Sequence, residues 1–352
     1  MLVVAVAACG KAGGGSGGGN RKSLDEGFAV GLLLPESKTA RYESFDKPLI
    51  EKNLLAACPK CTVLYQNAEQ DASKQQTQAD SLLSRGVQVL ILDPVDSRAA
   101  ASIVARAKQQ QVPVIAYDRF ASGPIDAFVT FDSERIGQEQ AKGLLAALEQ
   151  GGDPKRGPIV MINGAPTDPN SGEYKRGAHA ILDGKVTIGF EVDTPDWSPD
   201  KAQQEMEQAL TKLGAHNVIG VYVANDGMAS GVIAALKGQG VTPVPPVTGQ
   251  DAELAAIQRV VAGDQYMTIY APYARQAEMA AKMAIAAALG KPFEGTSIRE
   301  NASGHKVPTV LLPVIPVTRA NVKDTVVADG VYAAKDICAG APATACQQAG
   351  LL

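Results

Sequence analysis

Residues 87–119 read VQVLILDPVDSRAAASIVARAKQQQVPVIAYDR and place two short apolar runs on either side of a helical stretch. The runs Val87–Leu92 and Pro113–Tyr117 are almost continuously apolar, whereas a strand with one face in water alternates apolar and polar residues. Residues 97–111 carry apolar side chains three and four positions apart, which is typical of a helix. The stretch therefore predicts buried parallel strands that are covered by helices, as in a doubly wound α/β domain.

The same alternation of strands and helices recurs along the chain in two successive series. Strands of both series are too numerous for one sheet of this kind, so we expect two doubly wound, Rossmann-like α/β domains with parallel sheets. In such sheets the ligand lies in the crevice at the carboxyl ends of the strands. The predicted strands are Phe28–Leu34, Thr62–Tyr65, Val87–Leu92, Pro113–Tyr117, Ile159–Ile162, Val186–Val192, Val218–Val223, Pro246–Thr248 and Met267–Tyr270.

The composition is that of a globular protein large enough for two hydrophobic cores. Of the 352 residues, 45% are hydrophobic and 20% are charged. The net charge is -4 and the basic residues do not cluster, which argues against a protein that binds nucleic acid. The apolar runs are shorter than the roughly 20 residues that a membrane-spanning helix needs, so we do not expect a membrane-spanning protein.

Residues 1–27 differ from the rest of the chain. Val6-Ala7-Ala8 precede Cys9, and a glycine run that ends at Gly19 follows it. This order resembles the processing site of a bacterial lipoprotein, in which the cysteine becomes the lipidated first residue. We therefore expect a signal remnant and a flexible tether that anchors the folded part outside the cytoplasmic membrane; a buried free cysteine is the alternative. A phosphate-binding loop is not expected, because no strand precedes the glycines and no Lys-Ser or Lys-Thr follows them.

Four further cysteines form two close pairs in the sequence, Cys58 with Cys61 and Cys338 with Cys346. An even number suits an oxidising compartment, so we expect two local disulfides. A thioredoxin-like redox pair is the alternative at Cys58 and Cys61, but such a motif follows a strand and opens a helix. Here it closes a predicted helix and precedes a strand. No histidine has zinc-ligand spacing to these cysteines, and we expect neither a metal nor a cofactor.

Polar residues follow most of the predicted strands. Carboxylate, amide and guanidinium groups suit a polyhydroxylated ligand, because each sugar hydroxyl both donates and accepts hydrogen bonds. Trp197, the only tryptophan of the chain, and Tyr42 could cover the apolar face of a sugar ring. The residues after the strands are Glu36, Lys38–Tyr42, Asp93, Asp118-Arg119, Asp132, Asn163–Asn170, Asp193–Trp197, Asn225-Asp226 and Gln250-Asp251.

Five short motifs occur in order along the chain. They are Ala116-Tyr117-Asp118-Arg119, Thr130-Phe131-Asp132-Ser133-Glu134, Ala224-Asn225-Asp226, Gly249-Gln250-Asp251-Ala252-Glu253-Leu254 and Asp324-Thr325-Val326. Each is weak alone, but in this order and spacing they resemble the D-xylose-binding proteins among the type I periplasmic binding proteins of ABC importers. The resemblance runs from about Phe28 to about Val331.

The resemblance implies two α/β domains that are joined by a three-segment hinge and clamp a monosaccharide between them, as a monomer that delivers the sugar to a membrane permease. On this basis we expect one domain to comprise residues 28–132 and 271–317, and the other residues 133–270 and 318–352. Carried over position by position, the sugar contacts are Arg41, Tyr42, Asp118, Arg119, Asp168, Asn170, Trp197, Asn225 and Asp251.

One position departs from the family pattern. Where the family has a hinge lysine that reaches the sugar, this chain has Ala271. The loss of a long side chain opens volume beside the ring or admits a water molecule. D-glucose or a sugar alcohol is therefore an alternative ligand to D-xylose.

Other interpretations compete with this one. Asp118-Arg119 could be a surface ion pair, Trp197 an ordinary core or surface residue, Asp168 part of a turn, and Asn225-Asp226 a helix cap, with Asp226 as the capping residue and Asn225 toward the ligand. An enzyme is the main rival class, but the chain lacks a Gly-x-Ser-x-Gly elbow and a His-Glu-x-x-His motif. A sugar-sensing transcription regulator would need a helix-turn-helix before the first strand, where only the tether is found.

Overall fold

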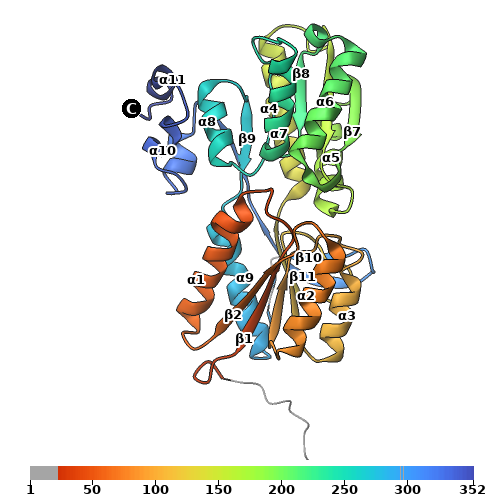
Figure 1. Ribbon diagram of the computed structural model, residues 1–352, viewed down its shortest axis with the longest axis vertical. Coiled ribbons are helices and arrows are strands. Elements are labelled where there is room, and N and C mark those ends of the chain that lie inside the picture. The colour runs from red at the N-terminus through yellow and green to blue at the C-terminus, as the bar shows by residue number, and fades with distance from the viewer. Residues whose placement is uncertain (1–22, 294, 296) are drawn as a thin grey trace, which may run out of the picture.

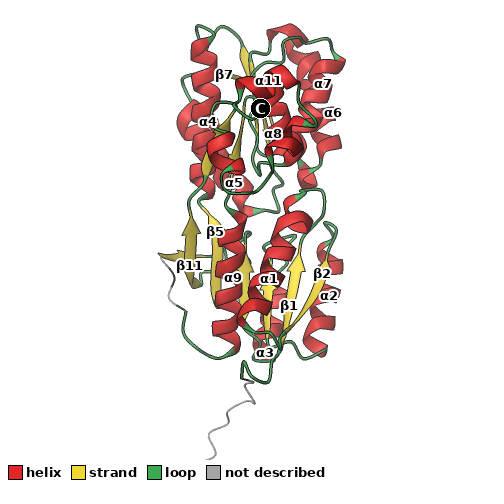
Figure 2. Ribbon diagram, turned by 90° about the vertical axis from the view of Figure 1, so that its left-hand side faces the viewer, coloured by secondary structure: helices red, strands yellow, loops and turns green. Residues whose placement is uncertain are grey.

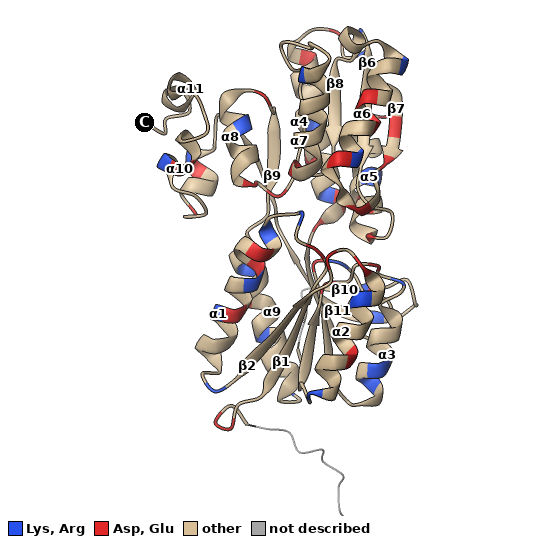
Figure 3. Ribbon diagram, in the orientation of Figure 1, with Lys and Arg blue, Asp and Glu red and all other residues tan. Residues whose placement is uncertain are grey.

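The computed structural model describes residues 23–293, 295 and 297–352, which form two lobes stacked along the long axis of the molecule (Figure 1). Cys9 and most of the glycine-rich tether lie outside the described residues. None of the described helices is both long and apolar enough to cross a membrane. Lysine, arginine, aspartate and glutamate are interspersed over the helices of both lobes (Figure 3), which agrees with the scattered charges of the sequence.

The first lobe, called the N-lobe, is built on a seven-stranded sheet in the order β10-β11-β5-β4-β3-β1-β2. All neighbouring strands are parallel except β10 and β11. The strands are β1 (Ala29–Leu34), β2 (Thr62–Asn67), β3 (Val89–Leu92), β4 (Val114–Tyr117), β5 (Ala127–Phe131), β10 (Ser297–Glu300) and β11 (Lys306–Leu312). The helices are η1 (Tyr42–Asp46), α1 (Lys47–Ala57), α2 (Ala72–Ser84), α3 (Ala101–Gln109) and α9 (Tyr273–Ala288).

Burial on both faces explains why the central strands are almost continuously apolar. Along β1, Leu32 packs in one hydrophobic cluster with Ile50 of α1, and Leu33 packs in another with Leu82 of α2 and Ile103 of α3. Helices therefore cover both sides of the sheet, as Figure 2 shows, and the predicted doubly wound α/β class is confirmed.

The second lobe, called the C-lobe, has a parallel sheet β7-β6-β8 and an antiparallel pair β12-β9. The predicted strand Pro246–Thr248 contributes a single bridge between Val247 and Val221. The strands are β6 (Pro158–Asn163), β7 (Thr187–Asp193), β8 (Gly220–Val223), β9 (Met267–Tyr270) and β12 (Ile315–Thr318). The helices are α4 (Ser133–Gln150), α5 (Pro169–Leu182), η2 (Pro195–Trp197), α6 (Pro199–Leu213), η3 (Ala215–Asn217), α7 (Asp226–Gly238), α8 (Leu254–Ala262), η4 (Lys323–Val327), α10 (Ala334–Cys338) and α11 (Ala343–Gln348).

The chain passes between the lobes at three places: after β5, after β9 and between β11 and β12. The third passage corrects the expected boundary after Val317. Val317 lies inside β12 and pairs with Thr268 of β9, so the change of sheet occurs between Leu312 and Ile315. Periodicity did not indicate β10, because its side chains are largely exposed at the sheet edge and Arg299 and Glu300 interrupt any apolar run.

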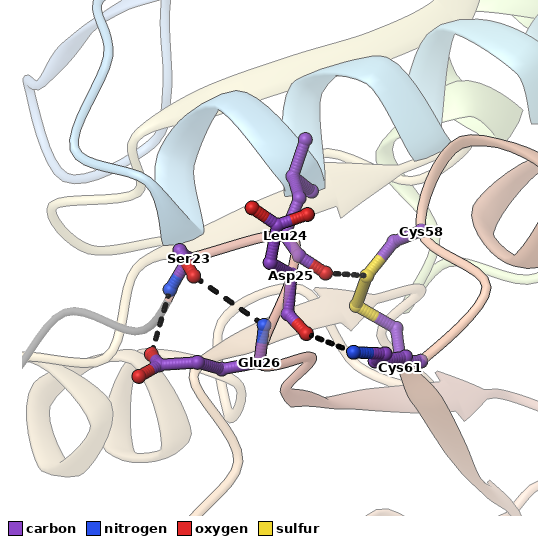
Figure 4. Close-up of a disulfide and its surroundings, with 7 residues drawn as sticks. Ser23, Leu24, Asp25, Glu26, Cys58 and Cys61 are labelled. Carbon is purple, nitrogen blue, oxygen red and sulfur yellow. Dashed lines mark hydrogen bonds between the residues drawn. A yellow bond between two sulfur atoms is a disulfide. The ribbon is translucent and has the colours of Figure 1, made fainter.

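Both cysteine pairs form disulfides, as predicted, with sulfur–sulfur distances of 1.98 Å for Cys58–Cys61 and 2.08 Å for Cys338–Cys346. The first closes the turn between α1 and β2, and the first described residues of the chain lie against it (Figure 4). Lys60 Nζ donates to the carbonyl oxygen of Asp25 at 2.7 Å. The second disulfide joins α10 to α11, which pack on α8 through a small hydrophobic cluster.

Candidate ligand-binding site

A small cavity of about 20 Å³ lies between the lobes at the carboxyl ends of their strands. The lining side chains fill most of the space, and what remains holds about one water molecule. The location is the one that a doubly wound sheet favours. The cavity is lined by Thr39, Arg41, Tyr42, Asp118, Arg119, Asp168, Tyr174, Trp197, Asn225, Gln250 and Asp251.

Eight of the nine predicted contact residues line this cavity, and Asn170 is the exception. Asn170 Nδ2 donates to the carbonyl oxygen of Asp118 at 3.1 Å, and its Oδ1 accepts from Ser133 Oγ at 3.1 Å. Its amide therefore connects the C-lobe helix α5 to the N-lobe strand end that carries Asp118.

Three lining residues were not among the predicted contacts. Thr39 and Gln250 belong to the polar segments that follow strands. In those segments the charged neighbours Arg41 and Asp251 were the predicted contacts. Tyr174 lies inside α5, four residues after Asn170. Residues four apart share one face of a helix, so the position of Asn170 was the signal that could have identified Tyr174.

Arg41 is held by two carboxylates at the N-lobe side of the cavity. Its Nε lies 2.7 Å from Asp46 Oδ2 and its Nη1 lies 3.3 Å from Asp118 Oδ1. The guanidinium carbon lies 4.4 Å from the centre of the Tyr273 ring, within the range of a cation–π interaction. Arg41 and Asp46 are both buried, so the pair is shielded from solvent and the guanidinium has little freedom to move.

Asp118 adopts a left-handed backbone conformation, with φ at 59°. Such a conformation costs energy for a residue other than glycine, and the surrounding bonds must hold it. Thr130 Oγ1 donates to the Asp118 carbonyl oxygen at 2.7 Å, and Tyr42 Oη donates to Asp118 Oδ2 at 3.2 Å. The carboxylate thereby points from the end of β4 into the cavity.

Asp118 and Arg119 are not the isolated surface ion pair that was the alternative interpretation, because both are buried and each faces other partners. Arg119 Nε lies 3.0 Å from Asp168 Oδ2, so this ion pair joins the two lobes. Asp168 also caps α5, where its Oδ1 accepts from the Asn170 backbone N–H at 2.9 Å. Burial raises the pKa of Asp168 to about 6, against the opposing effect of Arg119.

Trp197 forms part of the C-lobe wall and is only 5% exposed. Its ring meets the Tyr174 ring edge-on, with 6.2 Å between the centres. A side chain at Gly164 would place its Cβ 2.0 Å from the Trp197 ring, so only glycine fits there. Tyr174 and the backbone at Gly164 therefore both pack against the Trp197 ring.

Asn225 both caps a helix and lines the cavity. Its Oδ1 accepts from the Met228 backbone N–H at 3.0 Å, which makes Asn225 the N-cap of α7. The expectation that Asp226 would cap this helix is therefore wrong, because Asp226 is already the first helical residue.

Asp251 lies near Asn225 in the cavity wall and is buried. Its carboxylate accepts from Gln250 Nε2 at 3.0 Å, and burial raises the pKa of the Asp251 carboxyl well above the usual range.

The lining supplies both kinds of hydrogen-bonding group that a polyol needs. Three carboxylates accept hydrogen bonds, two guanidiniums donate them, and amide groups can do both. Ala271 is buried in the passage after β9 and does not line the cavity. As an alanine, it offers no cation to a ligand. Among the described residues, no cluster of histidine, cysteine, aspartate or glutamate has the arrangement of a metal site.

Comparison with known proteins places the chain in a family. Residues 30–292 match the model of the periplasmic binding protein domain. The D-xylose-binding periplasmic protein of Haemophilus influenzae is 31% identical over 314 residues, which cover 88% of this chain and 91% of that relative. These are binding proteins, which supports the expectation of a binding protein rather than an enzyme.

Two solved structures share the fold over nearly their whole length. The ABC transporter solute-binding protein of Clostridium phytofermentans with bound β-D-glucose has a TM-score of 0.81 and 25% identity, covering 88% of this chain and 99% of that structure. A carbohydrate transporter solute-binding protein of Chloroflexus aurantiacus in complex with D-glucose has a TM-score of 0.78 and 27% identity, covering 87% and 97%. The protein therefore belongs to the periplasmic binding protein family, with the type I fold of two α/β lobes around a ligand cavity.

Proposed function

We propose that this protein is the extracytoplasmic sugar-binding component of an ABC importer, which captures one monosaccharide between its lobes and delivers it to a membrane permease. The observation that carries the proposal is the cavity itself. Arg41, Asp118 and Arg119 from the N-lobe face Asp168 and Asp251 from the C-lobe, and aromatic rings stand on both sides. Several charge-assisted hydrogen bonds of about 1.5–3 kcal/mol each are enough for micromolar affinity, which corresponds to about 8 kcal/mol.

The ligand that we propose is D-xylose or a closely related sugar. The named relative binds D-xylose, which favours a pentose. Ala271 favours D-glucose or a sugar alcohol as the second candidate, because the missing lysine leaves more room and one fewer donor. The two glucose-bound solved structures support the same candidate.

Capture would work by a shift between open and closed arrangements of the two lobes. We propose that residues 28–132 with 271–314 move as one body and the remaining folded residues as the other. Direct contacts across the cleft, such as Arg119 with Asp168 and Arg299 with Glu173, accompany closure. A sugar that touches both lobes adds its binding energy to these contacts and so favours the closed form.

A thermal-shift screen against pentoses, hexoses and their alcohols tests this function. A ligand at 100 times its dissociation constant adds about 2.7 kcal/mol to the free energy of unfolding, which raises the melting temperature measurably. We expect D-xylose or D-glucose to give the largest shift, and Ala271→Lys to change the ratio between the two sugars in favour of D-xylose. If no sugar or sugar alcohol shifts the melting temperature of the unmodified protein, the proposed function is wrong.

We further propose that Cys9 carries the lipid anchor and that the protein acts as a monomer at the outer face of the cytoplasmic membrane. The supporting observation is the sequence Val6-Ala7-Ala8-Cys9 with its glycine-rich tether. Replacement Cys9→Ser should move the protein from the membrane fraction to the soluble fraction of the bacterium that produces it. Retention of the Cys9→Ser protein in the membrane fraction would contradict the anchor.

A further inference from the structure

Asp226 is a fully buried carboxylate directly behind the cavity, next to the lining residue Asn225. Three donors converge on it. Gln265 Nε2 donates to Oδ1 at 2.7 Å, while Thr268 Oγ1 and the backbone N–H of Glu253 donate to Oδ2 at 2.8 and 3.0 Å. Arg259 binds the Asp226 carbonyl oxygen at 3.0 Å rather than its carboxylate. The carboxylate is thus held by neutral donors, and one of them belongs to the loop that carries Asp251.

The loop from Gly249 to Glu253 has an unfavourable backbone conformation. Asp251 has φ at 96° and Ala252 has φ at 48°, so two successive residues other than glycine lie in the left-handed region. Each such residue is costly, and the conformation persists only where its surroundings enforce it. The direction of the Asp251 side chain depends on this strained backbone.

Asp226 contacts the loop at both of its ends. Its backbone N–H donates to the Gln250 carbonyl oxygen at 2.9 Å, and its carboxylate accepts from the Glu253 backbone N–H beyond the strained pair. Thr268 connects the middle, because its Oγ1 donates to Asp226 and accepts from the Ala252 backbone N–H at 3.2 Å. A Cβ at Gly249 would lie 2.0 Å from Asp226 Oδ1, so the loop packs directly on the carboxylate.

We infer that Asp226 is a positioning residue of the ligand site: its carboxylate holds the 249–253 loop in the strained conformation that aims Asp251 into the cavity. The inference rests on the proposed sugar-binding function of that cavity. Asp226 itself does not line the cavity, so it acts through Asp251 and not on the ligand.

An isosteric replacement separates this role from simple packing. In Asp226→Asn the side-chain NH₂ must face donors at one of the two oxygen positions, because Gln265, Thr268 and Glu253 all donate to the carboxylate. The loop loses at least one bond while the volume stays the same. We expect sugar affinity to weaken about tenfold or more at pH 8, where the Asp226 carboxyl, whose pKa burial raises to about 7, is ionised.

The dissociation constant is measured by titration calorimetry with the best sugar of the thermal-shift screen. The change in fluorescence emission of Trp197, the only tryptophan in the chain, on addition of the sugar gives a second measurement. The matched control is Leu182→Ala, a buried C-lobe residue at the end of α5 that does not line the cavity. We expect it to lower the melting temperature and leave the dissociation constant unchanged. If Asp226→Asn behaves like this control, Asp226 is a structural residue only and the inference is wrong.

A double-mutant cycle tests the route through Asp251. If Asp226 acts through that side chain, Asp226→Asn should weaken binding less than threefold further in a protein that already carries Asp251→Asn. Effects that multiply in full would overturn the inference. Should Asp226→Asn fail to fold, Thr268→Val removes the connecting hydroxyl and is expected to weaken binding severalfold, and an unchanged dissociation constant would count against the inference. If Asp251→Asn alone leaves binding unchanged, Asp251 does not contact the sugar. The assignment of the ligand site is then wrong, independently of the role of Asp226.

Discussion

Replacement of Asp118 by asparagine is expected to raise the dissociation constant for the sugar by at least about 100-fold, equivalent to about 2.7 kcal/mol. Asp118 is the lining carboxylate to which Arg41, Tyr42 and Gln276 all donate. Asparagine removes one acceptor oxygen and the charge that strengthens the bonds to sugar hydroxyls. It tolerates the left-handed conformation at φ 59°, so the backbone can stay in place.

Calorimetric titration of the folded variant measures this effect, and the melting temperature of the sugar-free protein shows whether the fold is intact. We expect that temperature to change by only a few degrees. A suitable control is Asp80→Asn, which removes the same charge from a partly exposed ion pair with Arg106 that contributes little to stability. Its affinity for the sugar should equal that of the unmodified protein. Affinity within threefold of normal for Asp118→Asn would show that the cavity has been assigned incorrectly.

Replacement of Arg41 by methionine is expected to abolish binding and also to destabilise the sugar-free protein. The change removes the cation from the buried carboxylate of Asp46, to which Arg41 makes two bonds of 2.7 and 3.1 Å. Removal of one partner from a buried ion pair costs about 3–5 kcal/mol, because the other charge stays uncompensated. With about 2–4 °C per kcal/mol for a domain of this size, the melting temperature should fall by roughly 10 °C.

A second substitution separates the two consequences. Asp46→Asn in the Arg41→Met background removes the uncompensated charge and leaves an amide that can still accept from Tyr117 Oη. We expect the double variant to regain most of the lost melting temperature and none of the sugar affinity. A single variant as stable as the unmodified protein would show that the pair is not a stabilising one. Normal sugar affinity in the double variant would show that Arg41 does not contribute to the binding site.

The architecture follows from local patterns that are legible along the chain. Val87–Leu92 and Pro113–Tyr117 are apolar because helices cover both faces of the strands, and a parallel sheet brings the carboxyl ends of its strands to one edge. The position of polar residues such as Asp118 and Arg119 directly after those strands therefore predicts that they meet in one crevice. The sequence also shows that Ala271 stands where the family pattern has a lysine.

The sequence does not predict the hydrogen-bond and ion-pair partners of those residues, because these partners depend on how the two lobes close. Arg119 pairs with Asp168, which lies 49 positions away in the other lobe, and not with its neighbour Asp118. Asn170 turned out to connect the lobes, and the capping role moved from Asp226 to Asn225. Local spacing says which side chains reach the crevice but not which of several nearby carboxylates an arginine will face.

The sequence by itself therefore determined the class of fold, the two disulfides and the set of polar groups that meet between the lobes, because each of these depends on periodicity, spacing or residue type. Only the tertiary structure decided the ion pairs across the cleft, the left-handed backbone at Asp118 and Asp251, and the buried support that Asp226 provides. These features arise from contacts between segments that are distant in sequence. Such contacts form only when the packing of both lobes excludes water and leaves each buried polar group to bond with whichever partner lies within reach.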